Sequence, residues 1–145
     1  MRDLPRKLTV EQLDELFEGR TTLVEQLAEI EDPLGQADRV LGRLSEEEKL
    51  EALNAHPEIG AKRLSVRSAA EQGADADPAV LTELAYLNQV YEEKFGFRFV
   101  VFVSGRPKRE VLEVLRTRLA RTREEELDTG CHELVAIARD RWTRT

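Results

Sequence analysis

One local pattern recurs along this chain and limits what it can fold into. A serine or threonine is followed three residues later by glutamate or glutamine, just ahead of a run of leucines. In such a capping box the hydroxyl accepts a hydrogen bond from a free amide of the first helical turn, and the third residue reaches back to the cap. The pattern occurs at Thr9 with Gln12, Thr22 with Glu25, Ser45 with Glu48, and Thr122 with Glu125. Each pair predicts the start of a helix.

The residues between these starts have helical periodicity. The first helix is expected to stop at Gly19, and the second to carry Leu23, Leu27 and Ile30 until Pro33 ends it. A third is expected over about 34–44. The clearest helix begins at Asp77 and Pro78, with an apolar stripe through Val80, Leu84, Leu87, Tyr91 and Phe95 and a stop at Gly96.

The stretch FRFVVFV at 97–103 has the composition of a β-strand. No second convincing strand is present to pair with it, so we interpret it as a buried extended segment or the start of a helix. The predicted fold class is therefore all-α, a single-domain compact helical bundle of about seven to nine helices over residues 1–145.

Composition narrows the class of protein. A chain of 145 residues that is 41% hydrophobic can build one core. A formal net charge of −7 argues against binding to nucleic acid or to an anionic membrane, and no stretch is long and apolar enough for a signal peptide or a membrane span. We expect a cytoplasmic protein. The single cysteine, Cys131, excludes an internal disulfide and is expected to be a small buried residue, and two histidines do not suggest a zinc site. The basic residues at 106–109 are interpreted as a solvated helix start.

His56 is the first candidate for chemistry. It precedes Pro57, which disfavours helix at His56, so the imidazole is expected where a helix ends and a loop begins. An imidazole titrates near neutral pH and can take or deliver a proton there. The alternative is that His56 only hydrogen-bonds the last carbonyls of the helix.

Glu71 is the second candidate, followed directly by Gln72. Ser68 and Glu71 themselves form a capping box, so a purely structural role is the alternative. His56 lies fifteen positions earlier, a separation that a loop with one tight turn can close into a shared pocket.

Arg141 is the third candidate because its spacing from Leu134 and Ile137 places it on the apolar face of the last helix. A buried guanidinium needs an acidic partner or an anionic ligand. Glu133 is about 12 Å away along the helix, too far to serve. We therefore expect Arg141 to be poorly satisfied without a ligand, unless it extends past the helix end to water.

Several segments together form a specific set of motifs: AHPEIG at 55–60, SAAEQ at 68–72, LNQVYEEKFGFRFV at 87–100, RL at 118–119 and ELVAIARDRW at 133–142. On these motifs the chain resembles the 2-oxo-4-hydroxy-4-carboxy-5-ureidoimidazoline (OHCU) decarboxylase family, the last enzyme in the conversion of urate to (S)-allantoin. The resemblance runs in the right order from residue 55 to residue 142.

The resemblance implies an all-α decarboxylase that needs no metal or organic cofactor, acts on a small ureidoimidazoline and commonly forms homodimers. It implies that the catalytic residues are His56, Glu71 and Arg141. The substrate-binding residues that it implies are Pro57, Ser68, Gln72, Phe99, Val100 and Val101, the last three through their backbone.

The chain departs from the family pattern in three places. Arg98 stands where the family usually has proline, the histidine motif reads HPEI where the family more often has HPDL, and the N-terminal third is short and lacks the usual Pro-Trp segment. Two alternatives therefore stay open: a helical binding or scaffolding module that keeps the fold without the activity, and an acidic helical interaction domain with no pocket. Convergence of His56, Glu71 and Arg141 on one site would favour the enzyme.

Overall fold

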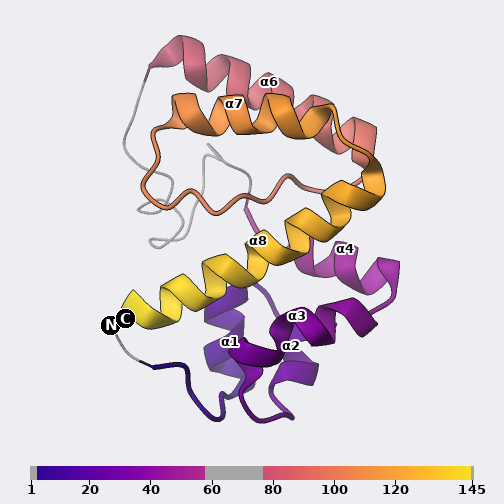
Figure 1. Ribbon diagram of the computed structural model, residues 1–145, viewed down its shortest axis with the longest axis vertical. Helices are drawn as coiled ribbons and strands as arrows, with labels where there is room; N and C mark the ends of the chain where they lie inside the picture. Colours follow the sequence, from indigo (N-terminus) through magenta and orange to yellow (C-terminus); the bar gives the residue numbers. More distant parts are fainter. Residues whose placement is uncertain (1–2, 58–76, 145) are drawn as a thin grey trace.

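The computed structural model describes residues 3–57 and 77–144, and over these ranges the chain is helical with no β-strand. The prediction of an all-α fold is confirmed. The helices, labelled as in Figure 1, are α1 (Val10–Phe17), α2 (Thr22–Leu27), α3 (Pro33–Arg43), α4 (Glu46–Asn54), α6 (Pro78–Phe95), α7 (Lys108–Leu119) and α8 (Arg123–Arg144).

The long helix α8 is the centre of the arrangement (Figure 1). Helices α1, α3 and α4 pack against it on one side, and α6 and α7 lie side by side on the other. Buried apolar side chains from all seven helices belong to a single core. The first described residue contacts the end of α8, because the indole Nε1 of Trp142 donates to the carbonyl of Asp3 at 2.8 Å.

Local helix signals from the sequence are largely confirmed. The capping boxes at Thr9 and Ser45 have both of their reciprocal hydrogen bonds, and Thr122 and Glu125 exchange bonds of 3.0 and 3.1 Å. Asp77 caps α6 with Pro78 at the first helical position, as predicted. These interactions are local, so sequence spacing alone is enough to predict them.

Several boundaries around α2 were predicted wrongly. Thr21 caps this helix by accepting from the Val24 amide at 3.4 Å, so the predicted capping box of Thr22 with Glu25 is not formed. Helix α2 ends at Leu27, before Ile30, and Pro33 begins α3 where it was expected to end the preceding helix. The Asp32 amide donates to the carbonyl of Arg6 at 2.8 Å, so the chain turns away from the axis of α2 before it reaches the proline. Proline then suits the first position of α3, where its missing N–H costs nothing.

Residues 97–103 form the predicted extended segment, and they do not start a helix. Phe97, Phe99, Val100, Val101 and Val103 are all buried. In place of a neighbouring strand, side chains from two helices hydrogen-bond to the backbone of this segment. The Arg118 Nη1 of α7 donates to the Val100 carbonyl at 2.7 Å, and a carboxylate oxygen of Glu133 on α8 accepts from the Phe102 amide at 3.4 Å. The segment therefore lies between α7 and α8 (Figure 1).

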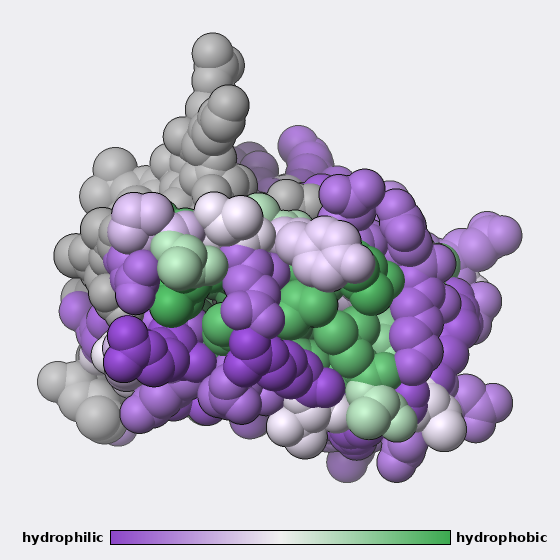
Figure 2. Space-filling model, turned by 90° about the horizontal axis from the view of Figure 1, so that it is seen from above, coloured by the Kyte–Doolittle hydropathy of each residue, from purple (hydrophilic) through white to green (hydrophobic). Residues whose placement is uncertain are grey.

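The interpretation of the basic residues at 106–109 as a solvated helix start is wrong for two of them. Lys108 is buried, and Arg106 donates to the carbonyls of Phe102 and Val103 at 2.6 and 3.0 Å. Arg109 does extend outward, with a side chain that is 72% exposed. The surface on this side of the molecule is mixed. Figure 2 shows hydrophobic residues between hydrophilic ones, and Tyr86 of α6 is 64% exposed.

Candidate active site

His56 lies two residues beyond the end of α4, as predicted. Its amide donates to the carbonyl of Leu53 at 3.2 Å, which continues the last turn before Pro57. The side chain is only 7% exposed. Its Nδ1 is buried and has no hydrogen-bond partner in the described part of the chain, so the ring does not cap the α4 carbonyls through that nitrogen.

The surroundings of His56 favour the neutral imidazole. Burial lowers its pKa from 6.5 to about 4; the positive charges of Arg141 and Arg98 also lower this pKa, and the Glu18 carboxylate opposes them. At neutral pH the ring is therefore uncharged. A neutral imidazole carries one N–H donor and one nitrogen acceptor, so it can accept a proton or relay one.

Arg141 of α8 is 2% exposed, on the apolar face where the sequence places it. The proposal that it extends past the helix end to water is wrong. Its Nη1 donates to the carbonyl of Leu16 at 2.9 Å and lies 3.2 Å from a carboxylate oxygen of Glu18. The expectation that Arg141 is poorly satisfied without a ligand is also wrong, because an acidic partner comes from the opposite end of the chain.

The end of α1 is shaped to bring that partner in. Glu18 takes the left-handed conformation with φ 63°, one residue before the predicted stop at Gly19. Gly19 has a different role. A Cβ there would lie 2.8 Å from the Cβ of Ala55, so glycine lets the end of α1 approach the end of α4. This close contact places Glu18 beside both Arg141 and His56.

A buried ionic network holds the extended segment from the other side. Glu126 of α8, fully buried, accepts from the Tyr91 hydroxyl at 2.6 Å and from Arg118 Nε at 2.7 Å. Burial, followed by the hydrogen bond to Glu126, raises the pKa of Tyr91 well above its usual value, so it remains a donor. Arg118 also faces the Phe99 ring at 4.6 Å. These contacts fix the backbone at Val100.

The backbone predicted to bind substrate is thus rigid. Phe99, Val100 and Val101 are at most 4% exposed. No residue in the described part of the chain accepts a hydrogen bond from their amide groups. Pro57 is half-buried beside His56. The predicted residues Ser68, Glu71 and Gln72 lie outside the described residues.

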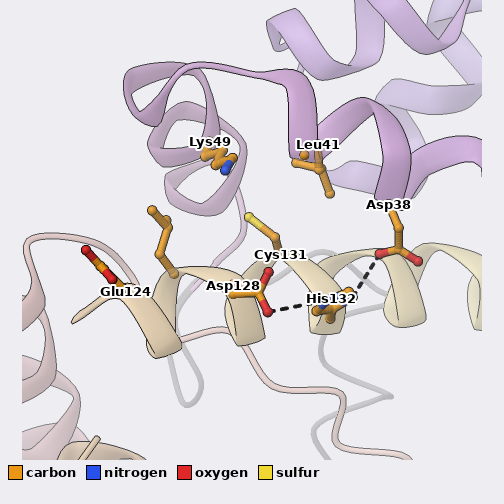
Figure 3. Close-up of a pocket in the computed structure, with 9 residues that line it drawn as sticks. Asp38, Leu41, Lys49, Glu124, Asp128, Cys131 and His132 are labelled. Carbon is orange, nitrogen blue, oxygen red and sulfur yellow. Dashed lines mark hydrogen bonds and ion pairs between the residues drawn. The ribbon is translucent and has the colours of Figure 1, made fainter. Parts of the chain in front are cut away.

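A cavity of about 240 Å³ opens away from His56 and Arg141, between α3, α4 and α8 (Figure 3). His132 lies in it between two carboxylates, with Nδ1 3.0 Å from Asp38 and Nε2 3.5 Å from Asp128. Burial raises the pKa of the neighbouring Cys131 to about 11, so its thiol stays protonated and is not a nucleophile. The expectation of a small buried cysteine is confirmed. His132 is nine residues from Arg141, on the opposite side of α8.

The sequence model of the OHCU decarboxylase family matches residues 2–143. The chain belongs to the OHCU decarboxylase family. Curated relatives include the 2-oxo-4-hydroxy-4-carboxy-5-ureidoimidazoline decarboxylase of Halalkalicoccus jeotgali, 29% identical over 65% of this chain and 56% of that protein. The uric acid degradation bifunctional protein TTL of Arabidopsis thaliana is 36% identical over 61% of this chain and 30% of its own length. The matched part is thus little more than half of the first relative and less than a third of the second.

The family assignment agrees with the fold. A solved structure of OHCU decarboxylase in the presence of (S)-allantoin superposes with a TM-score of 0.77, covering 92% of this chain and 96% of that chain at 24% identity. At this identity the likeness shows the fold alone.

Two features are absent from the described part of the chain. Among the described residues, no three His, Cys, Asp or Glu side chains gather as a metal site would require. No helix over 3–57 and 77–144 is long and apolar enough to cross a membrane.

Glu18, Arg98, Arg118 and Glu126 were not predicted from the sequence as site residues. For Arg118 a signal was present, because it belongs to a matched motif. Arg98 was noted only as a departure inside a matched motif, and Glu18 and Glu126 carried no signal.

Proposed function

We propose that this protein is a decarboxylase that converts OHCU to (S)-allantoin in urate degradation. Family membership supports the reaction class. The observation that carries the proposal is that His56 and Arg141 are both buried, and that burial, followed by the positive charge of Arg141, lowers the pKa of His56. This pair offers a proton carrier next to a site for a negatively charged group.

The chemistry needs little more. Cleavage of the bond between the ring carbon and the carboxylate releases CO₂ and leaves an electron pair, which the conjugated ring of the substrate can hold. A proton then adds to that carbon. The protein must therefore orient the substrate and deliver the proton to one face only, and that face decides which enantiomer of allantoin forms.

Each predicted site residue has a proposed role in this reaction. His56 carries the proton, and Arg141, held by Glu18 and the Leu16 carbonyl, binds an anionic or carbonyl oxygen of the substrate. We assign the ureido and ring N–H groups to Glu71 and Gln72.

The remaining members of the proposed site complete the pocket. Ser68 and Pro57 would line it, and the backbone of residues 99–101 would bind the ring. The rigidity of that backbone supports this role, because Arg118 holds the carbonyl of Val100.

We also propose that the chain works as one domain over residues 1–145, in the cytoplasm, as a homodimer, without a metal or organic cofactor. Its partner would be the small ureidoimidazoline, with no nucleic acid or membrane involved. The net charge of −7 supports the last point.

The experiment compares the chain's two histidines. OHCU is generated in situ from urate, and its loss is followed by ultraviolet absorbance with the parent protein, His56→Asn and His132→Asn. Asparagine keeps the approximate size but cannot carry a proton, so His56→Asn should lose about 100-fold or more in kcat, whereas His132→Asn should retain parent turnover. Equal turnover in both variants would remove His56 from the mechanism. A parent protein that binds allantoin without accelerating the reaction would support the scaffolding alternative.

A further inference from the structure

Arg98 makes four hydrogen bonds, and three of them join the extended segment to the end of α4. Its amide donates to Oδ1 of Asn54 at 3.0 Å. Its Nη1 donates to the carbonyl of Asn54 at 3.2 Å and to the carbonyl of His56 at 2.7 Å. Its Nε lies 3.3 Å from a carboxylate oxygen of Glu92 on α6. The guanidinium is therefore fixed between two helices.

These bonds act on a part of the chain that has few other constraints. The last carbonyls of a helix have no partners within it, and a cation at that end is favoured by the helix dipole. Pro57 has no amide hydrogen, so it cannot stabilise a further turn. The His56 backbone is consequently held at two points, its amide by Leu53 and its carbonyl by Arg98.

The side chain of His56 lacks the usual means of orientation. A catalytic imidazole is commonly oriented by a hydrogen bond to the ring nitrogen that does not take part in the reaction. In the described part of the chain, Nδ1 of His56 has no such partner. Ring orientation must then come from packing and from the backbone on which the ring is mounted.

We propose that Arg98 is a positioning residue for His56, fixing the peptide groups on which the imidazole is mounted and thereby aiming the ring at the substrate. This inference rests on the proposed function for its link to turnover. The link to ring geometry can be tested without turnover.

Arg123 offers a matched control. It also connects α4 to the region of α6, because its Nη1 lies 2.5 Å from a carboxylate oxygen of Glu46 and its Nε donates to the carbonyl of Phe95 at 2.9 Å. Those contacts lie at the start of α4, the end away from His56. Arg123→Ala should therefore cost stability as Arg98→Ala does, without disturbing the imidazole.

The kinetic test compares Arg98→Ala, Arg98→Lys and Arg123→Ala with the parent. A misplaced proton carrier should lower kcat by about tenfold to a hundredfold while KM changes by less than about threefold. Arg98→Ala should show this split, and Arg123→Ala should not. Arg98→Lys keeps the charge, but a single ammonium group cannot bind both carbonyls and Glu92 at once. Its kcat should therefore lie between the values for Arg98→Ala and Arg123→Ala.

The geometric test uses NMR of histidine-labelled protein, whose spectrum contains signals from two histidines only. In Arg98→Ala the His56 signals should broaden and titrate at higher pH, because a positive charge that lowers the pKa of His56 has been removed. The His132 signals are an internal reference, and Arg123→Ala should leave both sets unchanged.

The outcomes separate the two proposals. A parent without turnover overturns the proposed function, while the NMR comparison still decides the role of Arg98. Identical His56 signals in Arg98→Ala and the parent, or equal losses of kcat in Arg98→Ala and Arg123→Ala, overturn the positioning role. If Arg98→Ala does not fold, Arg98→Lys supplies the same comparison.

Discussion

Acid should destabilise this protein through His56, and the size of the effect can be worked from the structure. The folded protein holds the pKa of His56 at about 4, against 6.5 for a free side chain. As the pH falls below 6.5, His56 binds a proton in the unfolded chain but stays neutral in the folded chain. Its contribution to the free energy of unfolding is therefore fully present above pH 6.5 and is lost as the pH falls toward 4. At about 1.4 kcal/mol per pKa unit, the loss approaches about 3 kcal/mol.

The assay is urea denaturation of the parent and of His56→Asn at pH 7.5 and pH 4.5. Carboxylates titrate over the same range in both proteins, so only the difference between them reports on His56. The free energy of unfolding should fall further in the parent, by about 2 to 3 kcal/mol. Asparagine introduces a cost of its own, but that cost does not depend on pH. An equal pH dependence in the two proteins would refute the argument that His56 is buried in its neutral form.

Two further predictions concern the contacts that assemble the site. Gly19→Ala should destabilise the fold by about 1 to 3 kcal/mol in urea denaturation, because the new Cβ would lie 2.8 Å from that of Ala55. Adding Ala55→Gly should restore most of the lost stability. No recovery in the double variant would mean that this contact is not the cause. Allantoin at a hundredfold excess over its Kd should stabilise the parent by about 2.7 kcal/mol, seen as a rise in Tm, and Arg141→Leu should lose this shift. The ligand-free Tm of Arg141→Leu should also fall, because the buried ion pair between Arg141 and Glu18 is lost. Equal ligand shifts in both proteins would remove Arg141 from the site.

The local features of the fold could be predicted from the sequence because their causes are local. A capping box spans four residues, and the αL stop of α6 at Gly96 needs only a glycine after an apolar stripe. An extended conformation for residues 97–103 could be predicted because the sequence offers no second convincing strand to pair with this segment.

The partners of the site residues could not be predicted in the same way. Arg141 was correctly placed on an apolar face, but its ion pair with Glu18 joins opposite ends of the chain. Nothing in the sequence near Arg141 indicates which distant carboxylate meets it. The α1–α4 contact that delivers Glu18 depends on the lack of a side chain at Gly19, which the sequence suggested only as a helix stop.

The same limit applies to Arg98. In the sequence it is a single charged residue in an apolar stretch. Its proposed role depends on the hydrogen bonds that it donates to two carbonyls at the end of α4. Ion pairs that form across helices are set by tertiary packing, which spacing along one helix does not describe.

The central claim is that this chain catalyses a stereospecific decarboxylation. Its most direct test is the circular dichroism of allantoin formed from freshly generated OHCU, with the purified 145-residue chain at several concentrations. The account predicts an (S)-allantoin signal whose initial rate rises in proportion to protein concentration. Optically inactive allantoin, formed at the spontaneous rate whatever the protein concentration, would contradict it.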